Sequence, residues 1–406
     1  MLSLPAAQEK VLHEIRLLGA EKVALVQVRG RVLAEDVVAE RDNPPYDNSA
    51  MDGYAIRFED VSAASRAAPV ALEIIEEIAA GSISRRALGP GQASRIMTGA
   101  PLPEGADTVV PIEDVRATST RVEILASIEK GDHVRPRGDD IEAGAIVLTA
   151  GTCCDVGEIG LLAALQRSTI TVRKRPTVGI LSTGDELVDI DEPLAPGKIV
   201  NSNSYSLAEL CHAHGAVPLI HPIVRDSKAQ IRRAIEDMSD ADFILSSGGV
   251  SVGEYDFVKE VLEEMNARFR FWRVAMKPGK PLLFCTLGDQ PYFGLPGNPV
   301  SSMMSFLQFV RPAIRKASGF PANDLLLPRS AGVAGNRMVN DGDRPNYLRA
   351  RLELVDGRLR ATTRPGQGSH MLTSMLGANG VVQLDPGQVI EEGDAVELQI
   401  IPPFYT

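Results

Sequence analysis

Short apolar runs alternate with amphipathic runs through the middle of the chain. Residues 177–182, 217–224 and 242–245 are apolar and rich in strand formers, which is typical of strands covered on both faces. Strands that alternate with helices form βαβ units, and such units build parallel sheets. The pattern therefore predicts a three-layer α/β/α domain with a mainly parallel sheet. Its helices are expected at 202–214, at 227–238 and from residue 257.

The segments on either side of this α/β pattern have other periods. Apolar residues at helical spacing predict an amphipathic helix over 5–19, and a strand-like run follows at 23–28. Residues 55–137 hold short strand-like runs separated by turns, which favours a β-rich domain. Residues 141–165 read as a short strand followed by a helix. From about Asp324 onward short strands again alternate with turns, which predicts a small all-β domain.

Further elements are expected inside these segments. The β-rich segment should contain strands at 72–78, 93–97 and 107–111. Residues 273–281 read as a strand hairpin, and a long helix should run from the turn at 295–301 to about Ala317.

These patterns predict a multidomain α/β protein. An N-terminal helix and linker domain would comprise residues 1–43 and 139–175, and the β-rich domain inserted into it would comprise 44–138. The central α/β domain would span 176–322, and a C-terminal β domain resembling a small barrel would span 323–406. At 406 residues the chain is long enough for several cores.

The composition and net charge of the chain restrict the ligands and the compartment that we expect for it. The net charge of −11 argues against a general binder of nucleic acid or of anionic membranes, so an anionic ligand would need local cations. The four cysteines show no C-x-x-C spacing, which favours a reducing cytoplasm. The histidines of Cys211-His212-Ala213-His214 are two residues apart and would not share a helix face, which disfavours a zinc site. We find no signal peptide and no apolar segment of membrane-spanning length, so we expect a soluble, cytoplasmic protein.

The segment Ile244–Asp256 reads as a buried strand that enters a glycine-rich loop. Gly248, Gly249 and Gly253 permit backbone conformations closed to other residues, and their amides can approach an anion. Asp256 stands just before the next helix and is either its N-cap or a group that faces a ligand. We expect the chemistry of the protein to lie at this loop.

The same loop also matches the sequence pattern of another motif. Gly249-Val250-Ser251-Val252-Gly253 matches the G-x-S-x-G nucleophile elbow of α/β hydrolases. An elbow places its serine on a tight turn from strand to helix, whereas five residues separate Ser251 from the expected helix. The only downstream histidine is His370, among turn residues. We therefore do not favour a hydrolase.

Polar residues also gather in three other loops. The segment Asn43–Tyr54 is either a surface loop closed by an Asp-Gly turn or a set of oxygen ligands. The run Arg135–Asp140 mixes cations, glycine and carboxylates, and it is either a solvated charged loop or part of a site. Asp226 follows a strand and is either a helix cap or part of a site.

Seven motifs occur in a fixed order, and together they resemble the molybdopterin molybdenumtransferase family, the bacterial counterparts of the C-terminal domain of gephyrin. The resemblance spans nearly the whole chain. The motifs lie at Asn48–Tyr54, Met97–Ala100, Arg137–Ile141, Ser182–Leu187, Ser247–Asp256, Met276–Pro281 and Leu295–Ser301.

The resemblance implies a reaction and the residues that perform it. Members of the family insert molybdate into adenylated molybdopterin and release AMP, with a divalent cation such as Mg²⁺, which prefers carboxylate and phosphate oxygens. By this resemblance the catalytic residues are Asp52, Asp140, Glu186, Asp226 and Asp256. The metal ligands among them are Asp52, Glu186 and Asp256.

Two further sets of residues are implied by the same resemblance. The adenylated molybdopterin would be bound by Thr98, Arg135, Thr183, Gly184, Asp185, Asn203, Ser247, Gly248, Gly249, Ser251, Gly253, Pro296 and Asn298. Molybdate would be bound by Arg273, Lys277, Lys280, Pro281, Arg349 and Ser369. Family members commonly have Glu where this chain has Asp139 and often Lys where it has Arg273, and the planar guanidinium changes what that cation can bind.

The resemblance also implies partners. It implies a homodimer, and the molybdopterin adenylyltransferase is a candidate partner that would deliver the adenylated pterin. Two alternatives come from other classes: an enzyme like that adenylyltransferase, which would need only the central domain, and a scaffold like gephyrin, which would not need the carboxylates.

Overall fold

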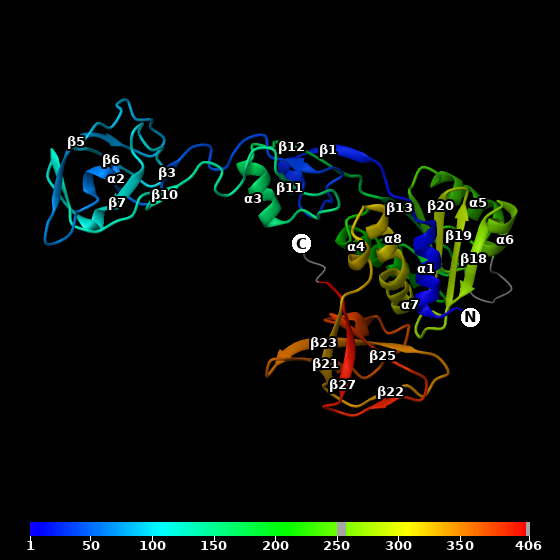
Figure 1. Cartoon of the computed structure of the whole chain (residues 1–406). Coiled ribbons are helices and arrows are strands. Elements are labelled where there is room, and N and C mark those ends of the chain that lie inside the picture. Colours follow the sequence, from blue (N-terminus) through cyan, green and yellow to red (C-terminus); the bar gives the residue numbers. More distant parts are fainter. Residues whose placement is uncertain (250–256, 403–406) are drawn as a thin grey trace. The chain divides into compact units, whose positions relative to one another are not determined.

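The computed structural model describes residues 1–249 and 257–402, and Figure 1 traces the chain. Its residues form two compact units. The large unit comprises Met1–Glu35, Gly151–Ile159 and Thr169–Thr406, and the small unit comprises Asp36–Ala150 and Gly160–Ser168. Ser251, Gly253 and Asp256, three of the predicted site residues, lie outside the described residues.

The central sheet of the large unit contains six strands in the order β16-β13-β17-β20-β19-β18. The first four strands run parallel, and β19 and β18 form an antiparallel hairpin at one edge. The mainly parallel sheet predicted from the sequence is thus confirmed. The bounds are β13 Thr177–Ser182, β16 Val217–Ile220, β17 Phe243–Ser247, β18 Arg268–Arg273, β19 Pro281–Leu287 and β20 Gln290–Leu295.

Helices cover both faces of this sheet. Adjacent residues of a strand point to opposite faces, and here the side chains on both faces are apolar and buried. Leu245 belongs to a core cluster with α1, α4, α7 and α8, whereas Ile244 belongs to a second cluster with α5 and α6. The predicted α/β/α layers are therefore present (Figure 1). The helices are α1 Leu4–Glu14, α4 Ser202–Ala213, α5 Lys228–Asp237, α6 Phe257–Glu264, α7 Pro299–Ser305, a π-helical segment Phe306–Val310 and α8 Arg311–Ala317.

The helix α1 is shorter than the sequence predicts. The predicted range of 5–19 is wrong at its end, because the chain becomes extended at Ile15 (φ −80°, ψ 125°), whose side chain is buried in the same core. The predicted strand 23–28 is also displaced. It appears as β1 Ala20–Ala24, which pairs with β12 Thr169–Arg173 and is followed by a 3-10 turn at Leu25–Gln27.

Two other differences lie at the edges of the central sheet. The strand expected at 217–224 ends at Ile220, where the chain turns into His221-Pro222. The hairpin expected at 273–281 exists as β18 and β19, but residues 274–280 connect these strands instead of forming them. A small parallel pair joins β14 Leu187–Val188 to β15 Ile199–Val200.

The C-terminal part of the large unit is a closed barrel, which confirms the predicted β domain. Along β23, Leu348 and Ala350 face the barrel core, whereas Tyr347 points the other way into the core of the central sheet. The barrel strands are β21 Arg329–Ala334, β24 Arg358–Thr363, β23 Asn346–Val355, β25 Gly380–Leu384 and β27 Ala395–Ile400, and β22 Met338–Val339 pairs with β26 Val389–Ile390 beside them.

The small unit is built on a sheet in the order β7-β4-β6-β5-β9-β8. The strands predicted at 72–78, 93–97 and 107–111 are confirmed within one or two residues. The bounds are β4 Gly53–Ile56, β5 Val70–Ile78, β6 Gln92–Ile96, β7 Thr108–Pro111, β8 Val115–Ala117 and β9 Arg121–Ile124, with the short elements β2 Val37–Val38, β3 Asn48–Ser49, α2 Phe58–Val61, β10 Val134–Arg135 and β11 Ile146–Leu148. The helix α3 Val156–Ala164 follows β11 in the sequence.

The segment 43–54 is not a simple surface loop. Asn48 and Ser49 are buried and form β3, which pairs with β10. No helix in the described part of the chain has the length and apolar character needed to cross a membrane.

Candidate anion-binding site

A cavity of about 980 Å³ lies in the large unit beyond the carboxyl ends of β13, β17 and β20. Open α/β sheets bind their ligands at this edge. The residues that follow these three strands form one side of the cavity, and residues 276–281, Arg344 and residues 367–370 form the other. We call residues 276–281 the cation loop because it carries Lys277 and Lys280.

A glycine turn after β17 forms the floor of the cavity beside β13. Gly248 and Gly249 have φ values of 91° and 66°, a region that favours glycine. A Cβ on Gly248 would lie 2.7 Å from the carbonyl oxygen of Thr183, and one on Gly249 would lie 2.6 Å from a methyl of Val258. Both positions therefore require glycine, and the resulting bare backbone is accessible from the cavity.

Hydroxyl and amide groups surround this turn. The Thr183 side chain lines the cavity, is 5% exposed and forms no hydrogen bond through Oγ1 with any described residue. Asn203 Nδ2 donates to Ser247 Oγ at 2.7 Å and to the Gly297 carbonyl at 2.8 Å, which fixes both side chains. A buried donor without a partner is costly, so the Thr183 hydroxyl is available to a ligand.

The cation loop is held by backbone pairing with the barrel. Lys277 N donates to the Pro345 carbonyl at 2.9 Å, and Tyr347 N donates to the Lys277 carbonyl at 2.7 Å. Neither Lys277 nor Lys280 forms an ion pair with a described residue, so both ammonium groups remain available on a fixed backbone.

The barrel side of the cavity is joined to the start of α7. Asn298 Nδ2 donates to Ser369 Oγ at 3.0 Å, and Val300 N donates to the Ser369 carbonyl at 3.1 Å. Arg344 adds a third cation to the lining, although it also pairs with Asp343 at 2.9 Å. The hydrogen bond from Arg344 and, after it, the charge of Arg344 hold the pKa of the Asp343 carboxyl below its ordinary value, with a smaller contribution from Lys280.

Arg349 lies behind this wall and does not line the cavity. Its side chain is 1% exposed, Nη2 donates to Ser374 Oγ at 2.9 Å, and Nη1 has no hydrogen-bond partner among the described residues. Burial lowers the pKa of the guanidinium to about 10. A buried cation without a carboxylate partner is uncommon, and here it lies beside Gly368, whose carbonyl is 3.5 Å from Nη2.

Three carboxylates follow the strand ends on the other side of β13. Asp185 N donates to Asp226 Oδ2 and Asp226 N donates to Asp185 Oδ1, each at 3.3 Å. Asp226 therefore does not cap α5, whose N-cap is Ser227. Burial raises the pKa of Asp226, and the charges of Asp185 and Glu186 raise it further.

Glu186 lines the cavity, and its carboxylate folds back over Gly184. A Cβ on Gly184 would lie 2.5 Å from Glu186 Oε2. The glycine in this position therefore permits the placement of the only carboxylate in the described lining of the cavity.

The small unit brings together other predicted residues. Asp52 Oδ1 accepts hydrogen bonds from the backbone N and the hydroxyl of Thr98, both at 2.8 Å, and these bonds hold the pKa of Asp52 below its ordinary value. Arg135 lies on β10, directly opposite Asn48 of β3. Asp140 accepts a hydrogen bond from Asn43 Nδ2 at 3.0 Å.

Some of the predicted site residues line the cavity and others do not. Arg273 ends β18, is exposed, does not line the cavity, and has its guanidinium carbon 5.9 Å from the centre of the Trp272 ring. Within the described residues no group of three or more carboxylate, histidine or cysteine side chains is placed to hold a metal ion. The predicted residues that line the cavity are Thr183, Glu186, Asn203, Ser247, Gly248, Gly249, Lys277, Lys280, Pro281, Pro296, Asn298 and Ser369.

Sequence reasoning missed part of the lining. Arg344, Gln367 and His370 come from the barrel, and their sequence neighbourhood reads as ordinary turns. Lys277 pairs with Asn346 across a long stretch of sequence, and no local signal predicts this pairing. The apolar part of the lining includes Leu187, Ile199 and Val200 of the β14 and β15 pair.

These features define the class of protein. The cavity of this α/β domain combines glycine backbone and the Thr183 hydroxyl at the ends of parallel strands with two lysines that pair with no described carboxylate. These groups suit an anionic, phosphate-bearing ligand. Three family models match the chain: the MoeA N-terminal region (domain I and II) over residues 2–165, a probable molybdopterin binding domain over 179–316, and the MoeA C-terminal region (domain IV) over 331–401.

Individual relatives agree with these models. The chain is 44% identical to the molybdopterin molybdenumtransferase of Nostoc sp. over 83% of its own length and 78% of the relative. It is 37% identical to molybdopterin molybdenumtransferase 2 of Mycobacterium tuberculosis over 98% and 99% of the two chains. A crystal structure of the molybdopterin biosynthesis MoeA protein of Pyrococcus horikosii superimposes with a TM-score of 0.85 at 30% identity, covering 99% of this chain and 100% of that one. The chain therefore belongs to the molybdopterin molybdenumtransferase (MoeA) family.

Proposed function

We propose that this protein inserts molybdate into adenylated molybdopterin and releases AMP, the last step of molybdenum cofactor synthesis. The single observation that carries the proposal is the composition of the cavity. One side offers glycine backbone and hydroxyl groups, and the other offers lysines that pair with no carboxylate in the described part of the chain. One cavity can therefore hold a phosphate-bearing ligand and a second oxyanion together. Membership of the family supports this assignment.

The phosphates of the adenylated pterin belong at the end of the cavity near β13 and β17. The Gly249 amide and the Thr183 hydroxyl, which donate to no described residue, are donors that suit phosphate oxygens, whereas the Gly248 amide already donates to the Leu295 carbonyl at 3.2 Å. The proposed set for this ligand is Thr98, Arg135, Thr183, Gly184, Asp185, Asn203, Ser247, Gly248, Gly249, Ser251, Gly253, Pro296 and Asn298.

Molybdate belongs at the opposite end, beside the cation loop. Lys277, Lys280 and Ser369 line the cavity there, with Pro281 at the start of β19. Arg349 would act through Gly368 and Ser374, which its guanidinium holds in place, and would add positive potential from behind the wall. A role for Arg273 at this end stays a prediction.

A divalent cation such as Mg²⁺ fits the donor chemistry of the chain. Glu186 presents carboxylate oxygens to the cavity. Burial is the main cause of the raised pKa of Asp226, and the charges of Asp185 and Glu186, which a cation would offset, raise it further. The proposed ligands are Asp52, Glu186 and Asp256, with Asp140 and Asp226 as further catalytic carboxylates. When bound, the ion would neutralise charge that develops on the leaving phosphate.

The proposal also covers the oligomeric state, the location and the partner of the protein. We infer a homodimer, a cytoplasmic location, and a molybdopterin adenylyltransferase that supplies the adenylated pterin. Light scattering should give a mass twice the 43.6 kDa of one chain. A mass of one chain at micromolar concentration would exclude the homodimer.

The decisive experiment supplies adenylated molybdopterin, molybdate and Mg²⁺ to the purified protein and measures AMP and active cofactor. We expect stoichiometric AMP release that requires molybdate, and we expect Lys280→Gln to lower it strongly. Lys22→Gln removes an equally charged but exposed lysine of β1 and serves as the matched control. AMP release without molybdate dependence, or equal activity of the two variants, would contradict the proposal. Consumption of ATP and molybdopterin would indicate the adenylyltransferase alternative.

A further inference from the structure

A second cavity of about 520 Å³ opens at one end of the barrel. Met338 and Leu348, which belong to the barrel core, line it, and residues at the end of β24 form its rim. The mouth of a barrel is a common place for a ligand. We call this space the barrel-mouth cavity.

Positive charge gathers around the barrel-mouth cavity. Lys277, Arg337 and Arg364 line it, against one carboxylate, Asp341. Arg337 is paired with Glu391 at 2.9 Å, whereas Lys277 and Arg364 form no ion pair with any described residue. In a chain of net charge −11, two cations that face one space and pair with no described carboxylate mark a local site for an anion.

A buried amide faces the same space. Asn346 lines the barrel-mouth cavity, is 6% exposed, and forms no side-chain hydrogen bond with a described residue. The neighbouring Asn336 is satisfied, since its Nδ2 donates to Thr363 Oγ1 at 3.0 Å and its Oδ1 accepts from Thr363 N at 2.8 Å. A buried polar group left without a protein partner indicates a ligand or water in the cavity.

The two cavities adjoin each other. Lys277, Gln367 and Gly368 line both of them. Gln367 is fixed by Arg349, whose backbone N donates to Gln367 Oε1 at 3.0 Å and whose carbonyl accepts from Nε2 at 3.1 Å. An anion in the barrel-mouth cavity would therefore lie next to the main cavity, separated from it by the residues that line both.

We infer that the barrel-mouth cavity is a second binding site for a tetrahedral oxyanion, next to the main cavity and sharing Lys277 with it. Cations on several sides and one amide donor suit a compact dianion, and the volume admits part of its hydration shell. That the physiological ion is molybdate rests on the proposed function. The site would hold the ion at the entrance and raise its local concentration beside the cation loop.

The test counts oxyanions with molybdate alone as the probe. Equilibrium dialysis of the full chain followed by molybdenum analysis should give two ions per chain, with sulfate competing for both. Arg364→Gln should retain one ion and bind the other about tenfold or more weakly, as expected for a lost charge-assisted contact. Arg351→Gln is the matched control, because Arg351 lies on β23, pairs with Glu353 and lines neither cavity. Arg364→Glu provides a stronger second variant at the same exposed position.

The outcomes separate this inference from the proposed function. One ion per wild-type chain, or identical binding by Arg364→Gln and Arg351→Gln, overturns the second site even when molybdate-dependent AMP release is intact. Two ions per chain with selective loss in Arg364→Gln supports the second site even when no AMP is released. In that case the proposed function fails and the oxyanion site stands.

Discussion

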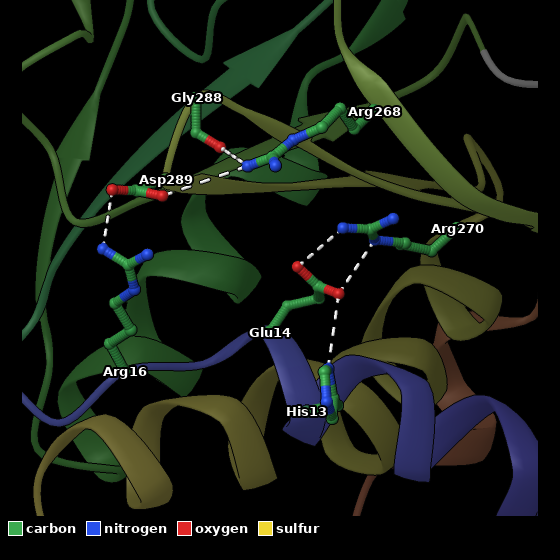
Figure 2. A network of polar contacts seen from close by, with 7 residues as sticks. All are labelled: His13, Glu14, Arg16, Arg268, Arg270, Gly288 and Asp289. Atoms are coloured by element: carbon green, nitrogen blue, oxygen red, sulfur yellow. Dashed lines mark hydrogen bonds and ion pairs between the residues drawn. The ribbon is translucent and has the colours of Figure 1, made fainter.

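Glu14 at the end of α1 and Arg270 on β18 form a two-point ion pair across 256 positions of sequence. Arg270 Nη2 donates to Glu14 Oε2 at 2.9 Å, and Nε lies 2.9 Å from Oε1 (Figure 2). Nearby, Arg16 reaches Asp289 at 2.6 Å, which gives the end of α1 a second attachment to the β18–β20 edge of the sheet. Burial raises the pKa of Glu14, but the hydrogen bond and charge of Arg270 outweigh it, so the pKa lies below its ordinary value of 4.5.

Glu14→Gln should therefore destabilise the large unit by about 1 kcal/mol at pH 7, because it removes a charge-assisted pair that is mostly shielded from solvent. The lowered pKa means that the pair contributes above pH 4.5 and is lost as the pH falls through the folded-state pKa. The difference between wild type and variant in urea unfolding should shrink below pH 4.5. Glu9→Gln, an exposed change on the same helix, should leave stability unchanged at both pH values. A pH-independent difference would refute the charge argument.

His214 should make the protein sensitive to mild acid. Burial lowers its pKa from 6.5 to about 3, with further lowering by Arg311 and Arg315, and its ring stacks on Phe306. Below pH 6.5 His214 binds a proton in the unfolded chain but not in the folded chain. The free energy of unfolding therefore falls as the pH drops below 6.5. One proton corresponds to at most about 1.4 kcal/mol per pH unit. His214→Phe keeps a ring and removes the proton, so its unfolding free energy should fall less between pH 6.5 and 5 than that of wild type. His212→Gln, at an exposed position, should behave as wild type does.

The glycine turn offers a test with a control of matched backbone geometry. Gly249 and Gly288 have φ values of 66° and 58°, but a Cβ on Gly288 meets nothing within 4 Å. Both alanine variants carry the cost of about 1 kcal/mol for a left-handed residue. Gly249→Ala should cost more because its Cβ would strike Val258 and Thr183, and it should also weaken binding of adenylated molybdopterin. Equal unfolding midpoints for the two variants, with unchanged ligand affinity, would show that the turn can relax.

Arg349 should affect the two substrates unequally. Arg349→Lys keeps the charge but loses the planar group that reaches Ser374 and Gly368. We expect the molybdate concentration for half-maximal AMP release to rise about tenfold, while the affinity for adenylated molybdopterin changes less than about twofold. Arg351→Lys, two residues along the same strand and exposed, provides the control. Parallel loss of both affinities would assign Arg349 to the fold as a whole instead of the molybdate end.

The sequence was a good guide to elements with a clear period. The pattern predicts the strand 177–182 to the residue and α4 within one residue, because alternation of strand and helix is a local signal. The end of α1 was misplaced, because Ile15 fits the helical period but packs into the core in an extended conformation. The division into four domains stays a prediction, since the described chain separates into two compact units.

The site was harder to foresee. Motif resemblance identified the cation loop and the glycine turn, but it could not show that Arg349 lies behind the wall or that Arg344 lines the cavity. These positions follow from which face of β23 points to the barrel core and from the pairing of Lys277 with Asn346. Both are long-range facts without a local pattern.

The position of α1 also sets an order of events during synthesis. Its apolar face packs against α8 and the neighbouring π-helical segment, and Gln8 donates to Gln308, which lies 300 residues later. At roughly 5–20 residues per second a ribosome would need about 15–60 s to make that stretch. Throughout this interval the α8 surface on which the helix packs has not been made, so Leu4, Ala7 and Val11 cannot complete their native core, and the first helix made completes its docking late. A nascent chain of this protein thus carries an exposed apolar helix for most of its translation, which makes that helix a natural binding site for chaperones.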